Sequence, residues 1–137
     1  MKPVVLDTSI IIAGCLSSGG APAALLDAFY RDRLTLAYTN AIFAEYMEIM
    51  ARPKFATAIS PQERHSLALK LHAHGVAVPP ASVPAAPWPD LDDLPFVAAA
   101  LATERKILVT LNPRDFVPAA PLGIRVLSPA EARRLLL

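Results

Sequence analysis

Apolar residues form two kinds of run along the chain. Short aliphatic runs bounded by polar or turn-forming residues predict buried strands, whereas longer segments with apolar residues three and four positions apart predict amphipathic helices. The predicted strands cover residues 2–6, 34–38, 107–111 and 124–127. The predicted helices cover a segment after Asp7 that is broken at Gly19 and Gly20, then residues 22–33, 41–52, 60–74 and 92–105, and a last helix that begins at Pro129.

Punctuating residues refine these boundaries. Asn40 is a suitable N-cap for the helix over 41–52, Pro53 ends that helix, and Gly75 ends the next one. Five prolines occur between Pro79 and Pro89. Because proline excludes regular hydrogen-bonded structure, we interpret this stretch as a stiff surface connector within one domain.

Strands that alternate with helices predict an α/β protein, a three-layer α/β/α sandwich with a central parallel sheet. The chain of 137 residues is long enough for one domain with a core, so residues 1–137 are expected to form a single domain. In such folds ligands bind at the carboxyl ends of the strands. Asp7 and the segment after Leu111 both follow predicted strands.

Composition adds expectations about surroundings and partners. With 54% hydrophobic and 18% charged residues the chain is not disordered, and the apolar surplus favours coverage by a partner or a second copy, hence a homodimer. A net charge of +1 means that any nucleic-acid contact is a local patch. Cys15 has no cysteine partner and is expected to be a small buried apolar residue. The first residues, MKPVVLDTS, contain no signal or membrane segment, so we expect a soluble, cytoplasmic protein without a membrane partner.

Two acids stand out in the first half of the chain. Asp7 ends a buried strand, and it is either a functional carboxylate or an ordinary N-cap of the following helix. Glu45 lies on the rim of the apolar helix face formed with Ile42 and Ile49, so it is either a cleft-facing carboxylate or a surface side chain. Glu48 points further out and stands four residues before Arg52, a spacing typical of a solvated ion pair.

Further acids occur in the second half. By helical geometry Asp93 shares a face with Phe96, Val97 and Ala100, whereas Asp92 projects away; Asp90 and Asp92 are explained by negative charge near a helix N-terminus. Asp115 follows the strongest strand, where simple turn chemistry is the alternative.

Taken together, the four acids predict a metal site. Asp7, Asp93 and Asp115 are expected at one sheet edge, with Glu45 facing it from a helix. Clustered carboxylates need a cation to stay ionised, and oxygen ligands without cysteine or histidine favour Mg²⁺ or Mn²⁺. The histidines lie away from these acids and are interpreted as surface or packing residues: His65, His72 and His74.

The ordered segments VVLDTS, the Glu45 helix, DLDDLPFVAAALA, LVTLNPRDF and IRVLSPAEA resemble the PIN-domain family, especially the toxin subunits of bacterial VapBC-like toxin–antitoxin modules. The resemblance runs over nearly the whole chain. It implies a compact α/β/α domain, a Mg²⁺- or Mn²⁺-dependent endoribonuclease acting on single-stranded RNA, 3′-hydroxyl and 5′-phosphate products, frequent dimerisation and inhibition by a cognate antitoxin protein.

The resemblance also assigns residues. Asp7, Glu45, Asp93 and Asp115 match the family's catalytic and metal-binding acids, and the supporting polar residues are Thr8, Ser9, Thr110 and Asn112. Ser9 stands where the family often has Asn, and Asn112 where some members have Asp. The second departure leaves open whether Asp115 binds metal directly or through water.

A nuclease of this kind would bind an RNA phosphate at the metal and activate a water for in-line attack, with Glu45 orienting that water or holding a second metal. The candidates for contact with the RNA backbone are Arg52, Lys54 and Arg114, each of which also suits a solvated charge.

Three other functions remain open at this point. A phosphatase with an aspartyl nucleophile needs a second Asp two residues on, where this chain has Ser9. The others are a housekeeping RNA-processing nuclease and a non-catalytic binding module of the same fold.

Overall fold

A computed structural model describes residues 2–137. The elements in chain order are β1 (Val5–Leu6), α1 (Thr8–Leu16), α2 (Ala21–Tyr30), β2 (Ala37–Tyr38), α3 (Asn40–Met50), the 3₁₀ helix η1 (Pro53–Phe55), α4 (Pro61–His74), β3 (Val76–Ala77), the 3₁₀ helix η2 (Leu91–Asp93), α5 (Leu94–Leu101), β4 (Ile107–Val109), the 3₁₀ helix η3 (Pro113–Leu122), β5 (Arg125–Leu127) and α6 (Pro129–Leu136).

The strands are short and all pair in parallel. β1, β4 and β5 form one sheet in the order β1-β4-β5, and β2 pairs with β3. A parallel bridge between Val4 and Leu36 joins the two parts. The resulting order is β3-β2-β1-β4-β5. The chain adds β2 and β3 on one side of β1, and it then crosses over to add β4 and β5 on the other side. This reversal lies between β1 and β4, where α/β folds bind ligands.

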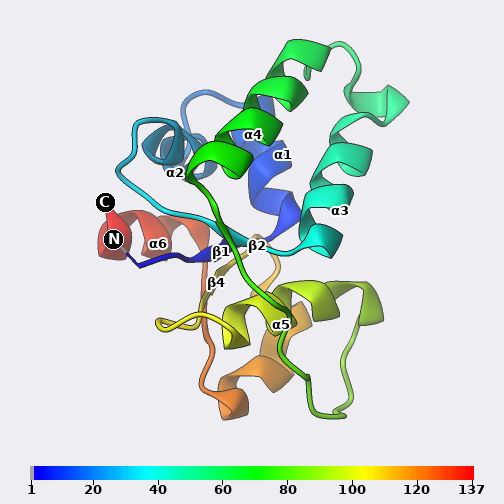
Figure 1. The fold of residues 1–137 in the computed structure, drawn as a ribbon, viewed down its shortest axis with the longest axis vertical. Coiled ribbons are helices and arrows are strands. Elements are labelled where there is room, and N and C mark those ends of the chain that lie inside the picture. The colour runs from blue at the N-terminus through cyan, green and yellow to red at the C-terminus, as the bar shows by residue number, and fades with distance from the viewer. Residues whose placement is uncertain (1) are drawn as a thin grey trace.

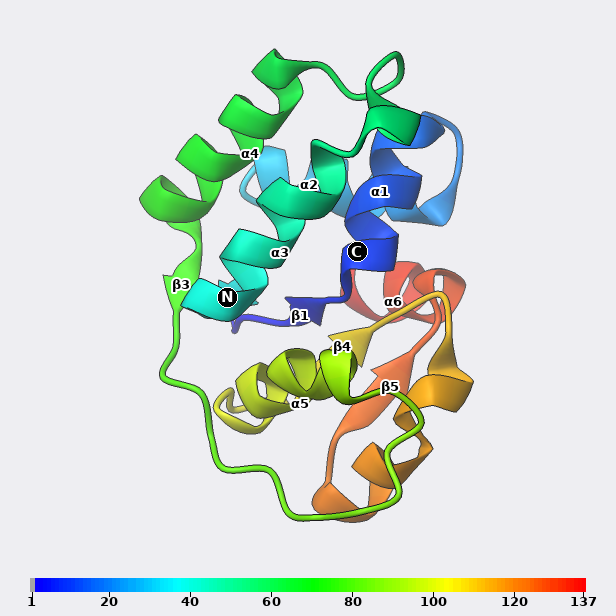
Figure 2. The ribbon, with the colours of Figure 1, turned by 90° about the vertical axis from the view of Figure 1, so that its right-hand side faces the viewer.

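Helices cover both faces of the sheet. In Figures 1 and 2 helices α1 to α4 lie on one side of β1, and α5 lies on the other. α1 packs on α2 and α3, α6 packs on α2 and β5, and α5 contacts β1, β2 and β4. The expected three-layer α/β/α sandwich with a parallel sheet is therefore confirmed.

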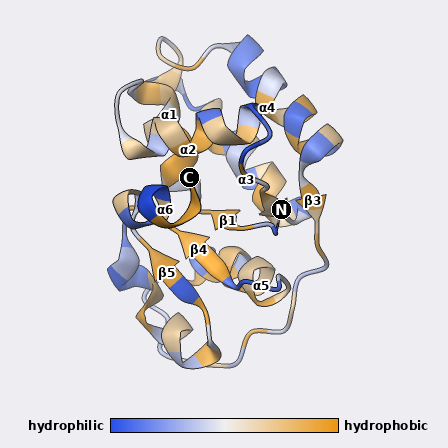
Figure 3. Ribbon diagram, turned by 90° about the vertical axis from the view of Figure 1, so that its left-hand side faces the viewer, coloured by the Kyte–Doolittle hydropathy of each residue, from blue (hydrophilic) through white to orange (hydrophobic). Residues whose placement is uncertain are grey.

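The sheet is the centre of the hydrophobic core. All residues of β1 and β4 are fully buried, and the apolar faces of α3 and α5 pack against them, including Ile42, Phe96 and Val97. In Figure 3 the ribbons of β1 and β4 have hydrophobic colours, whereas the ribbon of α4 has both hydrophobic and hydrophilic colours. Strands buried on both faces explain why the sequence shows continuous aliphatic runs there.

Several predicted boundaries were wrong. Thr39, not Asn40, caps α3: its hydroxyl oxygen accepts a hydrogen bond from the amide of Ile42 at 3.2 Å. The helix predicted from Pro22 to Arg33 ends at Tyr30, because Asp32 adopts a positive φ of 61°. All four predicted strands are shorter than their aliphatic runs, since burial extends beyond the paired residues.

The larger errors lie in the second half of the chain. The helix predicted over 92–105 is a 3₁₀ turn followed by α5, which ends at Leu101; the Thr103 hydroxyl donates to the carbonyl of Ala100, and Lys106 has a φ of 51°. The turn expected after Leu111 is the longer element η3, and β3 was not predicted. The proline-rich connector is irregular, as expected.

The histidines lie at the surface, as expected, and Cys15 is less buried than expected. The three histidines are exposed, and His72 stacks on Phe43 with ring centroids 4.6 Å apart. Cys15 packs against the core but is only partly buried; burial, with a smaller contribution from the charge of Glu63, raises the pKa of its thiol to about 11.

Among residues 2–137 no single helix is long and apolar enough to cross a membrane; α1 and α2 pass that test only together, as a pair bent by 97°.

Candidate active site

The carboxyl ends of β1 and β4 bring Asp7 and Thr110 together. Leu6 is in register with Val109, and the Asp7 amide donates to the Val109 carbonyl at 2.8 Å, so the next residue of each strand is a neighbour of the other. The Thr110 hydroxyl donates to Oδ2 of Asp7 at 2.7 Å. Asp7 is 7% exposed and Thr110 is fully buried. A buried carboxylate is thereby fixed at the point where the strand order reverses.

A second hydroxyl holds the same carboxylate oxygen. Ser9 donates from Oγ to Oδ2 of Asp7 at 2.9 Å, and its Oγ accepts the Leu111 amide at 3.2 Å. Asp7 occupies the N-cap position of α1, but its side chain makes no capping hydrogen bond. The ordinary capping interpretation of this acid is therefore wrong. We call Ser9 and Thr110 the hydroxyl cradle of Asp7.

Glu45 faces the same region from α3. The Thr8 hydroxyl donates to Oε2 of Glu45, which links the first turn of α1 to α3. Burial raises the pKa of Glu45, with smaller contributions from the charges of Asp7 and Asp92. Glu45 is partly buried and lines a cleft, so it is not a freely solvated surface side chain.

Tyr46 was overlooked in the sequence and explains how α3 is positioned. Its hydroxyl donates to the carbonyl oxygen of Leu6, one residue before Asp7, and the side chain is fully buried. Burial, followed by the charges of Asp7 and Glu45, raises its pKa, so the hydroxyl remains a donor. Its place four residues after Ile42, on the apolar face of the predicted helix, was a signal that it is buried.

The acids before α5 lie on a 3₁₀ turn rather than on the predicted α-helix. The Asp90 carboxylate accepts the Asp92 amide at 2.9 Å and caps this turn. Asp92 is exposed and Asp93 is partly buried, yet both line the cleft. The prediction that Asp92 projects away is therefore wrong, because α-helical geometry does not apply to a 3₁₀ turn.

The pKa of Asp93 is strongly raised. Burial, and then the negative charges of Asp7, Asp90, Asp115 and Glu45, raise its pKa from 3.8 to about 7. No hydrogen bond from another side chain offsets this effect in residues 2–137. The other three predicted acids are thus near enough to Asp93 to raise its pKa.

The segment after β4 agrees less well with the sequence analysis. Asp115 lies in η3 and is partly buried, but it does not line the cleft. Asn112 is exposed and acts through its backbone: its amide donates to the Thr110 hydroxyl at 3.0 Å, and its carbonyl accepts the Asp115 amide at 3.1 Å.

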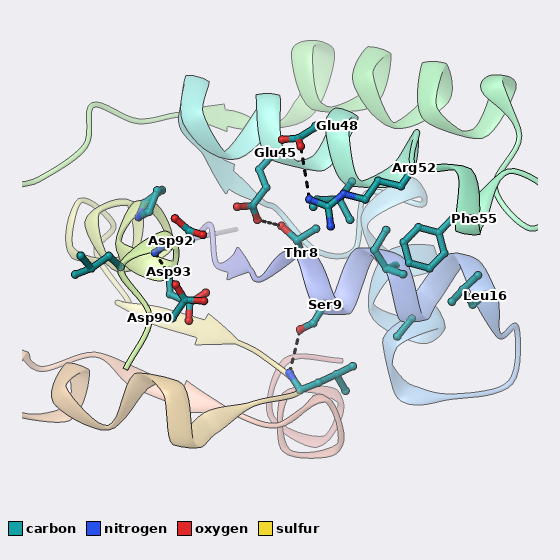
Figure 4. A pocket seen from close by; sticks show the side chains of 16 residues that line it. Thr8, Ser9, Leu16, Glu45, Glu48, Arg52, Phe55, Asp90, Asp92 and Asp93 are labelled. Carbon is teal, nitrogen blue, oxygen red and sulfur yellow. Dashed lines mark hydrogen bonds and ion pairs between the residues drawn. The ribbon is translucent and has the colours of Figure 1, made fainter. Parts of the chain in front are cut away.

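A cleft of about 930 Å³ lies between α1, α3 and the turn before α5 (Figure 4). Its lining includes Glu45, Asp92 and Asp93 but not Asp7. Figure 4 shows Glu45, Asp92 and Asp93 at one end, Arg52 near Glu48, and Phe55 with Leu16 at the other end. The lining residues outside the predicted set are mostly apolar: Ile12, Ala13, Leu16, Ile49, Phe55, Leu91, Pro95 and Leu111. They were not predicted because isolated apolar residues on amphipathic helices resemble core residues.

The cationic candidates are dispersed. Arg52 lines the cleft and lies 3.5 Å from a carboxylate oxygen of Glu48, as its spacing predicted. Lys54 lies over the ring of Phe55, with Nζ 5.1 Å from the ring centroid. Arg114 is exposed on η3 and is not part of the cleft lining.

The chemistry of the donor set fits a hard divalent cation. Carboxylate oxygens are the donors that Mg²⁺ and Mn²⁺ prefer, and burial, followed by the charges of neighbouring acids, raises the pKa of Asp93. As the side chains lie, no three acid, histidine or cysteine side chains of residues 2–137 converge on a single point. A cation would therefore be bound after side-chain rotation or with water completing its shell.

Acids at the carboxyl edge of a parallel α/β sheet lie where such folds bind their ligands. Comparison with known families matches residues 3–114 to the PIN domain, and the chain belongs to that family. PIN domains are typically nucleases that use divalent metal ions. The matched segment includes Asp7, Glu45 and Asp93 and ends one residue before Asp115. No curated protein matches the chain.

Proposed function

We propose that this protein is a Mg²⁺- or Mn²⁺-dependent endoribonuclease that cleaves single-stranded RNA. The observation that carries the proposal is the placement of Asp7 at the sheet edge of a PIN domain, held by two hydroxyls, beside a cleft that Glu45 and Asp93 line. A non-catalytic module has no need to hold a buried carboxylate with two hydroxyls beside three other acids.

The residues divide into distinct roles. Asp7 and Asp93 would hold the cation, and Asp115 would bind it directly or through water. A bound cation would offset charge on the RNA phosphate and lower the pKa of a water molecule. The hydroxyl cradle keeps Oδ2 of Asp7 in place, which leaves Oδ1 for the cation. Glu45, with its raised pKa, is suited to orient the attacking water and accept its proton.

The test is cleavage of a labelled single-stranded RNA by purified protein with Mn²⁺ or Mg²⁺, with EDTA and with Asp7→Asn. The Asn side chain preserves shape and still accepts hydroxyl hydrogen bonds. We expect EDTA to stop cleavage and Asp7→Asn to slow it at least about a hundredfold, the loss typical of removing a major electrostatic group. Undiminished cleavage by Asp7→Asn would indicate another site or a contaminating enzyme.

We further propose that the nuclease is the cytoplasmic toxin of a toxin–antitoxin pair, that it forms a homodimer and that an antitoxin protein inhibits it. The support is the ordered set of toxin-like segments, from VVLDTS to LVTLNPRDF, together with exposed apolar side chains such as Leu69 and Val117. Induced expression should stop growth, Asp7→Asn should not, and co-expression of the neighbouring small gene should restore growth. Equal growth with both variants would exclude the toxin role without affecting the nuclease proposal.

A further inference from the structure

We propose that the end of the cleft away from the acids is a subsite for one unpaired RNA base, with Phe55 as its stacking platform. The inference rests on the proposed ribonuclease function and adds how the enzyme selects single-stranded substrate. Figure 4 shows Phe55 and Leu16 at this end and Glu45, Asp92 and Asp93 at the other. Glu45 and Phe55 line the same cleft, so one RNA strand can contact both ends.

Phe55 is held by a tight local structure. It ends η1, which begins at Pro53 and is separated from the end of α3 by two residues, and its amide donates to the Arg52 carbonyl at 2.9 Å. Its own carbonyl accepts the Ile59 amide at 2.8 Å. Proline fixes the backbone at the start of this turn. The ring is therefore presented to the cleft by a defined backbone, partly buried and partly open.

Aliphatic side chains surround the ring. Ile12 and Leu16 come from α1 and Ile49 from α3, and all line the same cavity as Phe55. Leu16 is 48% exposed although it lies next to the core. An aromatic ring beside aliphatic walls matches the flat apolar face of a base, and stacking of this kind tolerates any of the four bases. A base paired within a duplex does not expose that face.

The charges at this end favour a nucleotide over an apolar protein side chain. Arg52 lines the cleft, and Lys54, which is not part of the lining, lies over the Phe55 ring with Nζ 5.1 Å from the ring centroid. The Glu48–Arg52 pair is 3.5 Å apart with both side chains largely exposed. Such a pair is weak, so Arg52 can turn to an RNA phosphate at little cost. Apolar faces for a base and cations for its phosphates thus occur side by side.

A double-mutant cycle between enzyme and substrate tests the subsite. Binding and steady-state cleavage are measured for wild type, Phe55→Leu and Phe55→Tyr on a short single-stranded RNA and on versions with one abasic position each. We expect Phe55→Leu to bind roughly tenfold more weakly, with KM affected more than kcat, and Phe55→Tyr to resemble wild type. One abasic position should weaken wild type to the same degree and leave Phe55→Leu unchanged.

Salt dependence gives a second readout that a structural role would not alter. Arg52→Ala should lower the slope of log affinity against log salt by about one, whereas Glu48→Ala should leave it or raise affinity. Leu135→Ala, an exposed apolar change on α6 outside the cleft lining, is the matched control. Melting temperatures identify any variant that is merely unfolded. If Phe55→Leu is unfolded, Phe55→Tyr still tests the position, because it retains an aromatic ring.

Additive effects in the cycle, or unchanged binding by Phe55→Leu, would overturn the subsite and leave this apolar end for a side chain of a protein partner. Asp7→Asn separates the two proposals. If Asp7→Asn abolishes cleavage while the Phe55 variants behave as wild type, only the subsite is wrong. If wild type does not cleave RNA, the proposed function and the subsite fail together.

Discussion

Asp7 and Asp93 lie at the same edge of the sheet, but the fold holds them differently. Asp7 follows a fully buried strand, and two hydroxyls donate to its Oδ2. Asp93 lies on a one-turn 3₁₀ helix after a proline-rich connector, and burial and neighbouring acids raise its pKa to about 7. The comparison shows that one carboxylate is positioned by the protein alone, whereas the other needs a proton or a cation to balance its surroundings.

The largest loss of RNA cleavage should come from removing the charge of Asp93, which no side-chain hydrogen-bond donor in the described part of the chain stabilises. Asp93→Asn should lower RNA cleavage at least about a hundredfold, and Glu45→Ala should do the same. Asp92→Asn and Glu48→Ala should retain most activity, because these side chains are exposed and Glu48 pairs with Arg52. The measurement is kcat/KM on one RNA. Loss of activity in Asp92→Asn but not in Asp93→Asn would transfer the role described for Asp93 to its neighbour.

A cation should stabilise the folded protein through both acids. At one hundred times its dissociation constant it adds about 2.7 kcal/mol to the free energy of unfolding, a rise of roughly 5–15 °C in Tm for a chain of this size. Melting curves with EDTA, Mg²⁺ and Mn²⁺ provide the measurement. The shift should shrink greatly in Asp7→Asn, which without metal should be no less stable than wild type. Identical curves under all conditions would remove the metal from the proposed mechanism.

The hydroxyl cradle can be weakened without touching a carboxylate. Thr110→Val preserves shape but removes the donor to Asp7, a hydrogen bond to a charged group worth about 1.5–3 kcal/mol. We expect cleavage to fall by roughly tenfold and Thr110→Ser to restore most of it. Equal rates for Thr110→Val and wild type would show that Asp7 is held well enough by Ser9 alone.

The smallest effect concerns pH. The pKa of Asp93 is about 7 in the fold and has an ordinary value of 3.8, so between these values the folded metal-free protein binds more protons than the unfolded chain. Its stability should therefore fall as pH rises from about 4 to about 7. The loss should be on the order of 1 kcal/mol, because solvent screens this half-exposed group. Urea denaturation with EDTA measures it, and Asp93→Asn should flatten the slope; an unchanged slope would assign it to another group.

The helices in the first half of the fold were predictable because apolar periodicity and helix-ending residues indicate the same boundaries there. Apolar periodicity located α3 and α4, and proline and glycine marked their ends. The second half contains 3₁₀ turns, whose apolar pattern resembles a helix over only one turn. For that reason η2 and η3 were missed, and with them the correct positions of Asp92 and Asp115.

The site was predictable as a set of acids but not as a geometry. Strand ends identified Asp7, and helical phase identified Glu45. The contact of Tyr46 with Leu6, and the convergence of Ser9 and Thr110 on one oxygen, depend on tertiary packing between distant segments. The cleft lining was hidden because Ile12, Leu16 and Phe55 resemble ordinary core residues in the sequence.

The hydrogen bond between Thr110 and Asp7 joins residues 103 positions apart. During translation the first strand and its acid leave the ribosome long before the strand that completes the site. A nascent chain that lacks Thr110 has neither this donor nor the β1–β4 pairing that positions the Asp7 backbone. Products of the gene that terminate before Thr110 are therefore expected to lack a correctly positioned Asp7 and to be inactive.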